Sequence, residues 1–176
     1  MPGKTAQPDI PLPLLEQYLT EKMGLGTADM QVAIASLERV SGGQSNPTYF
    51  LTISGQPMVL RKAPTGEGLP GAHAVDREFR VMNALAGTGV PVPKVHRLET
   101  DPRALGAPFY VMERVQGVIE HRSDLPDHSE ASRRLIYRDK AHVLGRLHAI
   151  DPASVGLSDF GRPGNFFERQ IARWSK

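Results

Sequence analysis

Cysteine is absent from the 176-residue chain, which excludes disulfides, thiolate metal ligands and a cysteine nucleophile. Long apolar runs are absent too, since none approaches the ~20 residues that a membrane-spanning helix requires. Residues 1–12 contain no apolar segment of the kind found in signal peptides. We therefore expect a cytoplasmic protein with no membrane partner.

An excess of one charge is also missing. The chain has 21 Lys and Arg residues against 19 Asp and Glu residues, and the basic residues are scattered along it. Nucleic-acid-binding proteins typically concentrate Lys and Arg on one face, so we expect no nucleic-acid partner. Hydrophobic residues make up 40% of the chain, which is enough for a packed core. The length predicts one domain, or one domain and part of another.

Apolar spacing and turn signals predict an antiparallel α+β lobe over residues 13–116, preceded by a flexible, proline-rich tail at residues 1–12. The expected elements of this lobe are a helix at 13–23, three strands in a meander at 32–40, 48–54 and 58–62, a helix at 72–86, and two strands at 95–98 and 109–115. Five antiparallel strands with one inserted helix would form the sheet layer of this lobe.

The character of the chain changes in residues 117–176, which we expect to form the incomplete beginning of a helical lobe. Helical spacing of apolar residues predicts helices at 129–150 and 165–174. In an incomplete lobe, several large side chains would lack packing partners, namely Leu147, Phe166, Phe167 and Trp174. Exposed apolar surface of this kind favours self-association, so a homo-oligomer is an expected partner state.

A glycine-containing segment between the first two strands of the meander is suited to binding an anion. Adjacent glycines adopt backbone dihedrals closed to other residues, so that amide N–H groups can converge on a phosphate, and neighbouring polar side chains add donors. The segment consists of Ser41, Gly42, Gly43, Gln44, Ser45 and Asn46. Taken alone, paired glycines more often mark an ordinary hairpin turn.

Two cations end the third expected strand, and a carboxylate follows on the next helix. Side chains alternate along a strand, so only one of Arg61 and Lys62 can face a given side of the sheet. Glu78 falls within the apolar stripe of its helix, where a carboxylate needs a partner. A strand cation is a natural partner for Glu78, although a Glu that extends to solvent remains the alternative.

The last expected strand of the first lobe, at residues 109–115, leads directly into the second lobe. Backbone groups at its end, from Glu113 to Val115, could form hydrogen bonds with an adenine ring. The alternative is an ordinary core strand, and the two interpretations are compatible.

In this order, these segments resemble the aminoglycoside phosphotransferase family of kinase-like enzymes, in the branch related to acyl-CoA dehydrogenase-fused phosphotransferases. The resemblance covers about residues 32–174 and includes the segments 90–93, 106–113 and 156–161. It implies a protein-kinase-like N-terminal lobe, ATP and Mg²⁺ as cofactors, and phosphorylation of a hydroxyl on a small molecule.

The resemblance also assigns roles to individual residues. Arg61 takes the phosphate-binding position, with Lys62 as the second choice, and Glu78 takes the position of the orienting carboxylate. The residues from Glu113 to Val115 take the adenine-contacting position.

The catalytic segment of the resembled family does not occur in these 176 residues. That segment contains His-Gly-Asp, then an Asn and an acidic metal ligand, and this chain has no such sequence. Asp159, Phe160 and Gly161 match the metal-binding triad of protein kinases, but in the resembled family they form a connector.

We therefore predict no catalytic or metal-ligating residue here and expect metal ligands downstream of Lys176. The chain alone would be inactive. The alternative function is a non-catalytic module that binds a nucleotide or a protein partner.

Overall fold

The computed structural model describes most of the chain and divides it into two compact units. The described ranges are residues 10–23, 34–40, 46–64, 74–161 and 164–175. One unit comprises Met1–Asn83 and Val92–His121, and the other comprises Ala84–Pro91 and Arg122–Lys176. Residues 1–9 of the expected tail lie outside the described residues, whereas Ile10 is buried in an apolar core and Leu12 begins a helix. The boundary expected at residues 116 and 117 stays a prediction.

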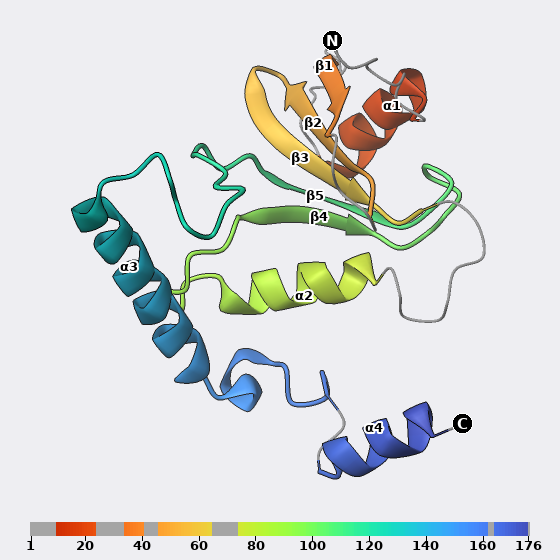
Figure 1. Ribbon diagram of the computed structural model, residues 1–176. Coiled ribbons are helices and arrows are strands. Elements are labelled where there is room, and N and C mark those ends of the chain that lie inside the picture. Colours follow the sequence, from red (N-terminus) through yellow and green to blue (C-terminus); the bar gives the residue numbers. More distant parts are fainter. Residues whose placement is uncertain (1–9, 24–33, 41–45, 65–73, 162–163, 176) are drawn as a thin grey trace. The chain divides into compact units, whose positions relative to one another are not determined.

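The first unit contains a five-stranded antiparallel sheet in the order β1-β2-β3-β5-β4 (Figure 1). Its strands are β1 (Ile34–Arg39), β2 (Thr48–Ile53), β3 (Gln56–Lys62), β4 (Val95–Glu99) and β5 (Phe109–Glu113). The expected α+β class, the meander of the first three strands and the total of five antiparallel strands are confirmed. The sheet order beyond β3 had no counterpart in the sequence analysis.

The turn between β2 and β3 is shorter than the sequence suggested. Ser54 and Gly55 both have positive φ, at 47° and 79°. Two successive residues with positive φ match the twist of a tight hairpin. Strand pairing therefore resumes at once, and β3 starts at Gln56, two residues before the expected start at Met58.

One face of the sheet carries the larger hydrophobic core, which is closed by α1 (Leu12–Met23) (Figure 1). Leu15 and Leu19 of α1 are fully buried against residues of β2, β3 and β5. Tyr18 stacks edge-on against Phe109, with ring centroids 5.1 Å apart, and its hydroxyl donates to Glu99 at 2.8 Å. A single helix therefore contributes both apolar packing and a polar link to β4.

The opposite face carries a second apolar cluster together with α2 (Val75–Leu85). Val75 and Tyr110 are buried in this cluster, and Phe79 and Met82 of α2 pack against it. The rings of Phe79 and Tyr110 meet edge-on with centroids 6.1 Å apart. The expected apolar stripe of this helix is thus directed at β5, and it brings Glu78 with it to the sheet.

The second unit contains α3 (Glu130–His148), a short 3-10 helix (Pro152–Val155) and α4 (Phe166–Trp174). Ser129 caps α3 by accepting a hydrogen bond from the Ser132 amide. The expected apolar side of α4 is exposed to solvent, with Phe167 at 79% and Trp174 at 82% of full exposure. None of the helices in the described ranges is long and apolar enough to cross a membrane.

Two leucines of α1 provide a matched test of how the larger core is held together. Leu19→Ala should lower the free energy of unfolding by about 2–5 kcal/mol, because it leaves a cavity in the closed core. Leu14→Ala makes the same change at a side chain that is 51% exposed and should cost under about 0.5 kcal/mol. Urea unfolding of both variants measures the difference; equal losses would show that α1 does not close this core.

Candidate functional site

Strand alternation places the two cations of β3 on opposite faces of the sheet. Arg61 pairs across the sheet with Thr48 on β2 and Tyr110 on β5, and it shares their face, the one that carries α2. Lys62 pairs with Phe109 and lies on the side of the larger core, where it is 2% exposed. Of the two candidates, Arg61 is therefore the cation on the α2 side.

Glu78 is the centre of a hydrogen-bonded cluster on this face. One carboxylate oxygen, Oε2, accepts from Arg61 Nε at 2.7 Å and from the Tyr110 hydroxyl at 2.9 Å. The other, Oε1, accepts from Arg61 Nη2 at 3.2 Å and from Asn46 Nδ2 at 3.0 Å. The predicted pair between Glu78 and a strand cation is confirmed, and a carboxylate with four donors has its acceptor sites filled.

Glu78 contributes to raising the pKa values of both Arg61 and Tyr110. Burial acts to lower the pKa of Arg61, but the hydrogen bonds and negative charge of Glu78 outweigh it, and the net shift is upward. Burial, aided by Glu78, raises the pKa of Tyr110 far above its ordinary value, so its hydroxyl stays protonated and able to donate. The cluster thus pairs the Arg61 guanidinium with the Glu78 carboxylate at 2.7 Å.

Arg61 keeps donors that the described residues do not use. A guanidinium has five N–H groups. Two bind Glu78, and a third, on Nη1, binds the Thr48 hydroxyl at 3.1 Å. Within the described ranges, this leaves one N–H on Nη1 and one on Nη2 without a partner. The Arg61 side chain is 30% exposed.

A row of apolar side chains lies next to Arg61 on the same face. Phe50, Val59 and Met112 pair with one another across β2, β3 and β5, two residues along from the row of Thr48, Arg61 and Tyr110. Two residues of strand correspond to about 7 Å. Arg61 therefore adjoins an apolar strip formed by these three side chains.

The backbone beyond β5 offers a free amide beside this strip. The amide of Glu113 donates to the Lys94 carbonyl at 2.9 Å, and that of Arg114 donates to the Pro57 carbonyl at 3.3 Å. In the described part of the chain, Val115 is the first residue after β5 whose amide has no backbone partner. The Arg114 guanidinium lies 3.8 Å from the centre of the Phe50 ring.

Not all predicted site residues fall within the described ranges. Ser41, Gly42, Gly43, Gln44 and Ser45 lie outside them. Asn46 is described and is only 4% exposed, and its amide is bound to Glu78. Thr48 and Tyr110 were missed, because only the pairing of β2 and β5 with β3 brings them to Arg61, and no spacing along the chain signals it.

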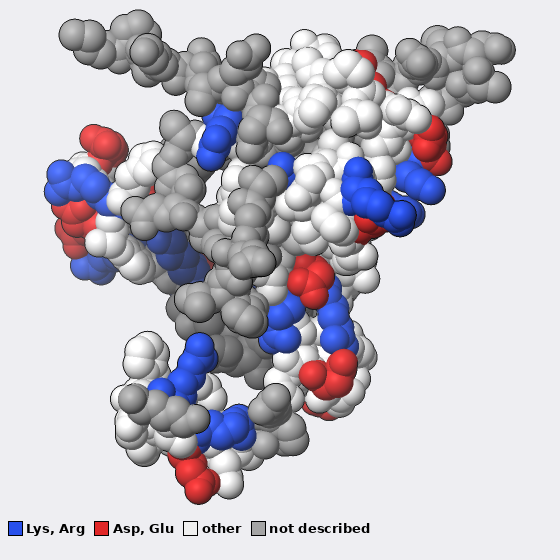
Figure 2. Space-filling model, turned by 90° about the vertical axis from the view of Figure 1, so that its right-hand side faces the viewer, with Lys and Arg blue, Asp and Glu red and all other residues white. Residues whose placement is uncertain are grey.

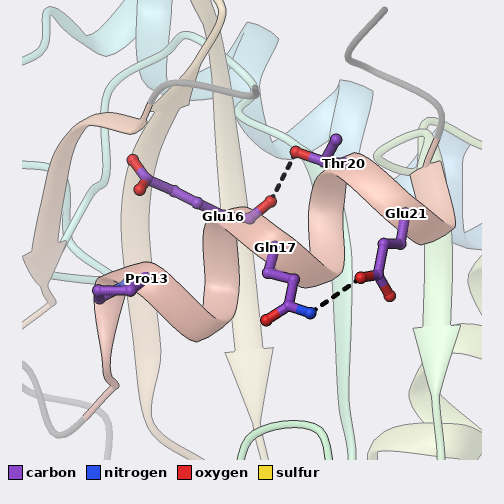
Figure 3. A pocket seen from close by; sticks show the side chains of 5 residues that line it. All are labelled: Pro13, Glu16, Gln17, Thr20 and Glu21. Carbon is purple, nitrogen blue, oxygen red and sulfur yellow. Dashed lines mark hydrogen bonds between the residues drawn. The ribbon is translucent and has the colours of Figure 1, made fainter. Parts of the chain in front are cut away.

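A surface hollow beside α1 has a different character. Among the described residues, it is lined by Pro13, Glu16, Gln17, Thr20 and Glu21, all from α1 (Figure 3). Figure 3 shows Gln17 bonded to Glu21, and Glu16 Oε1 also accepts from the Ile34 amide. Carboxylates without a cation do not suit a phosphate, and the helix packs on the face of the sheet opposite Arg61.

The face of the molecule drawn in Figure 2 shows basic and acidic side chains interspersed among uncharged ones. No single-sign patch of the kind that nucleic-acid-binding proteins display is visible on this face. The expectation of no nucleic-acid partner remains untested.

Comparison with known proteins adds independent information. The model of the phosphotransferase enzyme family matches residues 36–176. The chain belongs to the phosphotransferase enzyme family. The match includes β2, β3, α2 and β5, the elements that carry the site.

A solved phosphotransferase-family structure shares the fold. It is a Ralstonia eutropha protein named as an aminoglycoside phosphotransferase, with a TM-score of 0.76 and 38% identity over 94% of this chain and 46% of that one. The kinase-like fold expected from the sequence is thus confirmed.

Curated relatives carry the same region within much longer chains. Acyl-CoA dehydrogenase family member 10 of Mus musculus is 42% identical over 95% of this chain and 15% of its own length. Acyl-CoA dehydrogenase family member 11 of Homo sapiens is 36% identical over 99% of this chain and 24% of its own length. The chain spans less than a quarter of each of these two relatives.

The contribution of Glu78 can be separated from the effect of its position in the helix. Asp76 and Glu78 both lie in the first turn of α2, so neutralising either removes a similar interaction with the helix dipole. Glu78→Gln also removes the charge that accepts from Arg61, Asn46 and Tyr110. We expect Glu78→Gln to lower the free energy of unfolding by about 1–2 kcal/mol more than Asp76→Asn does. Equal urea midpoints for the two variants would contradict the role of the cluster.

Proposed function

We propose that the protein is the nucleotide-binding part of an ATP-dependent phosphotransferase that phosphorylates a hydroxyl of a small molecule. The observation that carries this proposal is the Arg61–Glu78 pair. It holds a guanidinium in place with two donors left for an anion. Membership of the phosphotransferase family and the shared fold support the same reaction class.

The phosphate groups of ATP would lie at the free N–H groups of Arg61. Phosphoryl transfer depends mainly on positioning and on neutralising charge, and a guanidinium matches phosphate oxygens with two parallel hydrogen bonds. Glu78 fixes the guanidinium before the nucleotide arrives, so less freedom is lost on binding. In this role Arg61 binds the substrate, and Glu78 acts through Arg61.

The adenine base would lie along the apolar strip of Phe50, Val59 and Met112. The free amide of Val115 would donate to a ring nitrogen, and the carbonyl of Glu113 could accept from the amino group. The strip lies about 7 Å from the row that contains Arg61, on the same face of the sheet. One nucleotide could therefore contact both rows at once.

Mg²⁺, when bound with ATP, would neutralise charge on the phosphates. The described residues contain no cluster of His, Asp and Glu that could hold a metal ion. The 176 residues also lack the His-Gly-Asp sequence of the resembled family. We therefore propose that this chain binds the nucleotide, and that by itself it does not transfer phosphate.

A non-catalytic nucleotide-binding module is the second candidate function. It is favoured by the same absence of a His-Gly-Asp sequence from these 176 residues. The two candidates share the site described above and differ only in whether phosphate transfer follows. Transfer from labelled ATP to a hydroxyl acceptor by a native product that includes these residues would exclude the second candidate.

Binding of Mg-ATP should stabilise the protein. At a nucleotide concentration 100 times the Kd, the free energy of unfolding should rise by ~2.7 kcal/mol, which a thermal or urea unfolding series would detect. Arg61→Met should lose most of this gain relative to its own unliganded state. Arg138→Met, at an exposed position of α3, should keep it.

The proposal has a clear negative result. No stabilisation of the wild-type chain by millimolar Mg-ATP would contradict nucleotide binding. An equal gain in wild type and Arg61→Met would leave nucleotide binding intact but would remove Arg61 from the site.

A further inference from the structure

The cluster around Arg61 closes into a ring of hydrogen bonds that begins and ends at Asn46. The side-chain amide of Asn46 donates to Glu78 Oε1 at 3.0 Å, and the same oxygen accepts from Arg61 Nη2 at 3.2 Å. On the other side, Arg61 Nη1 donates to the Thr48 hydroxyl at 3.1 Å, and that hydroxyl donates to the backbone carbonyl of Asn46 at 3.2 Å. Asn46 thus binds both groups that hold the guanidinium, Glu78 through its side-chain amide and Thr48 through its backbone carbonyl.

The direction of every bond in the ring is set by chemistry. A carboxylate can only accept and a guanidinium can only donate, so the group of Asn46 that faces Glu78 must be its NH₂. The Thr48 hydroxyl has one hydrogen, which it donates to the backbone carbonyl of Asn46, and a lone pair that accepts from Arg61. Each member therefore fits its place without a conflict of donors or acceptors.

Burial makes the amide of Asn46 costly to replace. The residue is 4% exposed, although amide side chains usually remain at the surface. A buried polar group is tolerated when its hydrogen bonds are made, and removing one partner leaves the other unsatisfied. Asn46 is also the last residue of the glycine-containing segment, directly after residues 41–45.

We propose that Asn46 is a positioning residue, which holds the guanidinium of Arg61 with its two unused N–H groups available to the phosphates of a nucleotide. This role rests on the proposed nucleotide binding. It differs from the role that the sequence suggested, in which Asn46 was one more donor to the phosphates themselves. In the proposed role, Asn46 acts on the phosphates through Glu78, Thr48 and Arg61.

Isosteric substitutions separate positioning from packing. Asn46→Asp keeps the size of the side chain but places a second carboxylate beside Glu78 in place of a donor. Thr48→Val keeps the branched shape that suits a strand and removes the hydroxyl, whereas Thr48→Ser keeps the hydroxyl. Asn46→Asp and Thr48→Val should each break the ring, and Thr48→Ser should preserve it.

The test compares the affinities of Mg-ATP and of adenosine, measured by titration calorimetry below the melting temperature of every variant. Adenosine has the base and ribose but no phosphate, so it does not depend on Arg61. Asn46→Asp and Thr48→Val should weaken Mg-ATP at least tenfold and change adenosine affinity less than twofold. Thr48→Ser should bind both ligands as the wild type does.

Each other outcome overturns a specific claim. Wild-type affinity for Mg-ATP in Asn46→Asp and Thr48→Val would overturn the positioning role alone. Parallel losses for Mg-ATP and adenosine would show that Asn46 serves only to stabilise the fold. Failure of the wild-type chain to bind Mg-ATP at all would overturn the proposed function, and the positioning role with it.

Discussion

The carboxylate of Glu78 is the constraint on which the candidate site depends. It accepts four hydrogen bonds, which come from β3, from β5 and from Asn46, the last residue of the glycine-containing segment. Removing a partly buried acceptor of this kind leaves several donors unsatisfied at once. The apolar face of α2 that packs on the sheet also carries this carboxylate. The packing of α2 therefore brings the carboxylate into the site.

The two faces of the sheet carry different groups of residues. The α1 face holds the larger apolar core, and the α2 face holds the charged row and the apolar strip beside it. Strand alternation assigns each residue of β3 to one of these faces. Leu60 and Lys62 lie on the α1 face, and Val59 and Arg61 lie on the α2 face. Among the described residues, the two N–H groups of Arg61 that no residue accepts lie on the α2 face.

The helices, the strands and the pairing of Glu78 with a strand cation could be predicted from the sequence. The other contacts of this pair could not. Glu78 was identifiable because a carboxylate within an apolar helical stripe requires a partner, and a strand cation 17 residues away supplies it. The choice between Arg61 and Lys62 needed the sheet, since alternation says only that they differ in face. Tyr110, Thr48 and the bracing role of Asn46 depend on strand pairing and on burial, neither of which is encoded in local spacing.

The most direct test of this picture is a crystal structure of the chain with Mg²⁺ and a non-hydrolysable ATP analogue. The predicted result is a phosphate oxygen within hydrogen-bonding distance of Arg61 Nη1 or Nη2, with Glu78 still bound to Nε. The base should lie against Phe50, Val59 and Met112. An analogue bound elsewhere, or an Arg61 side chain turned away from both Glu78 and the phosphates, would contradict it.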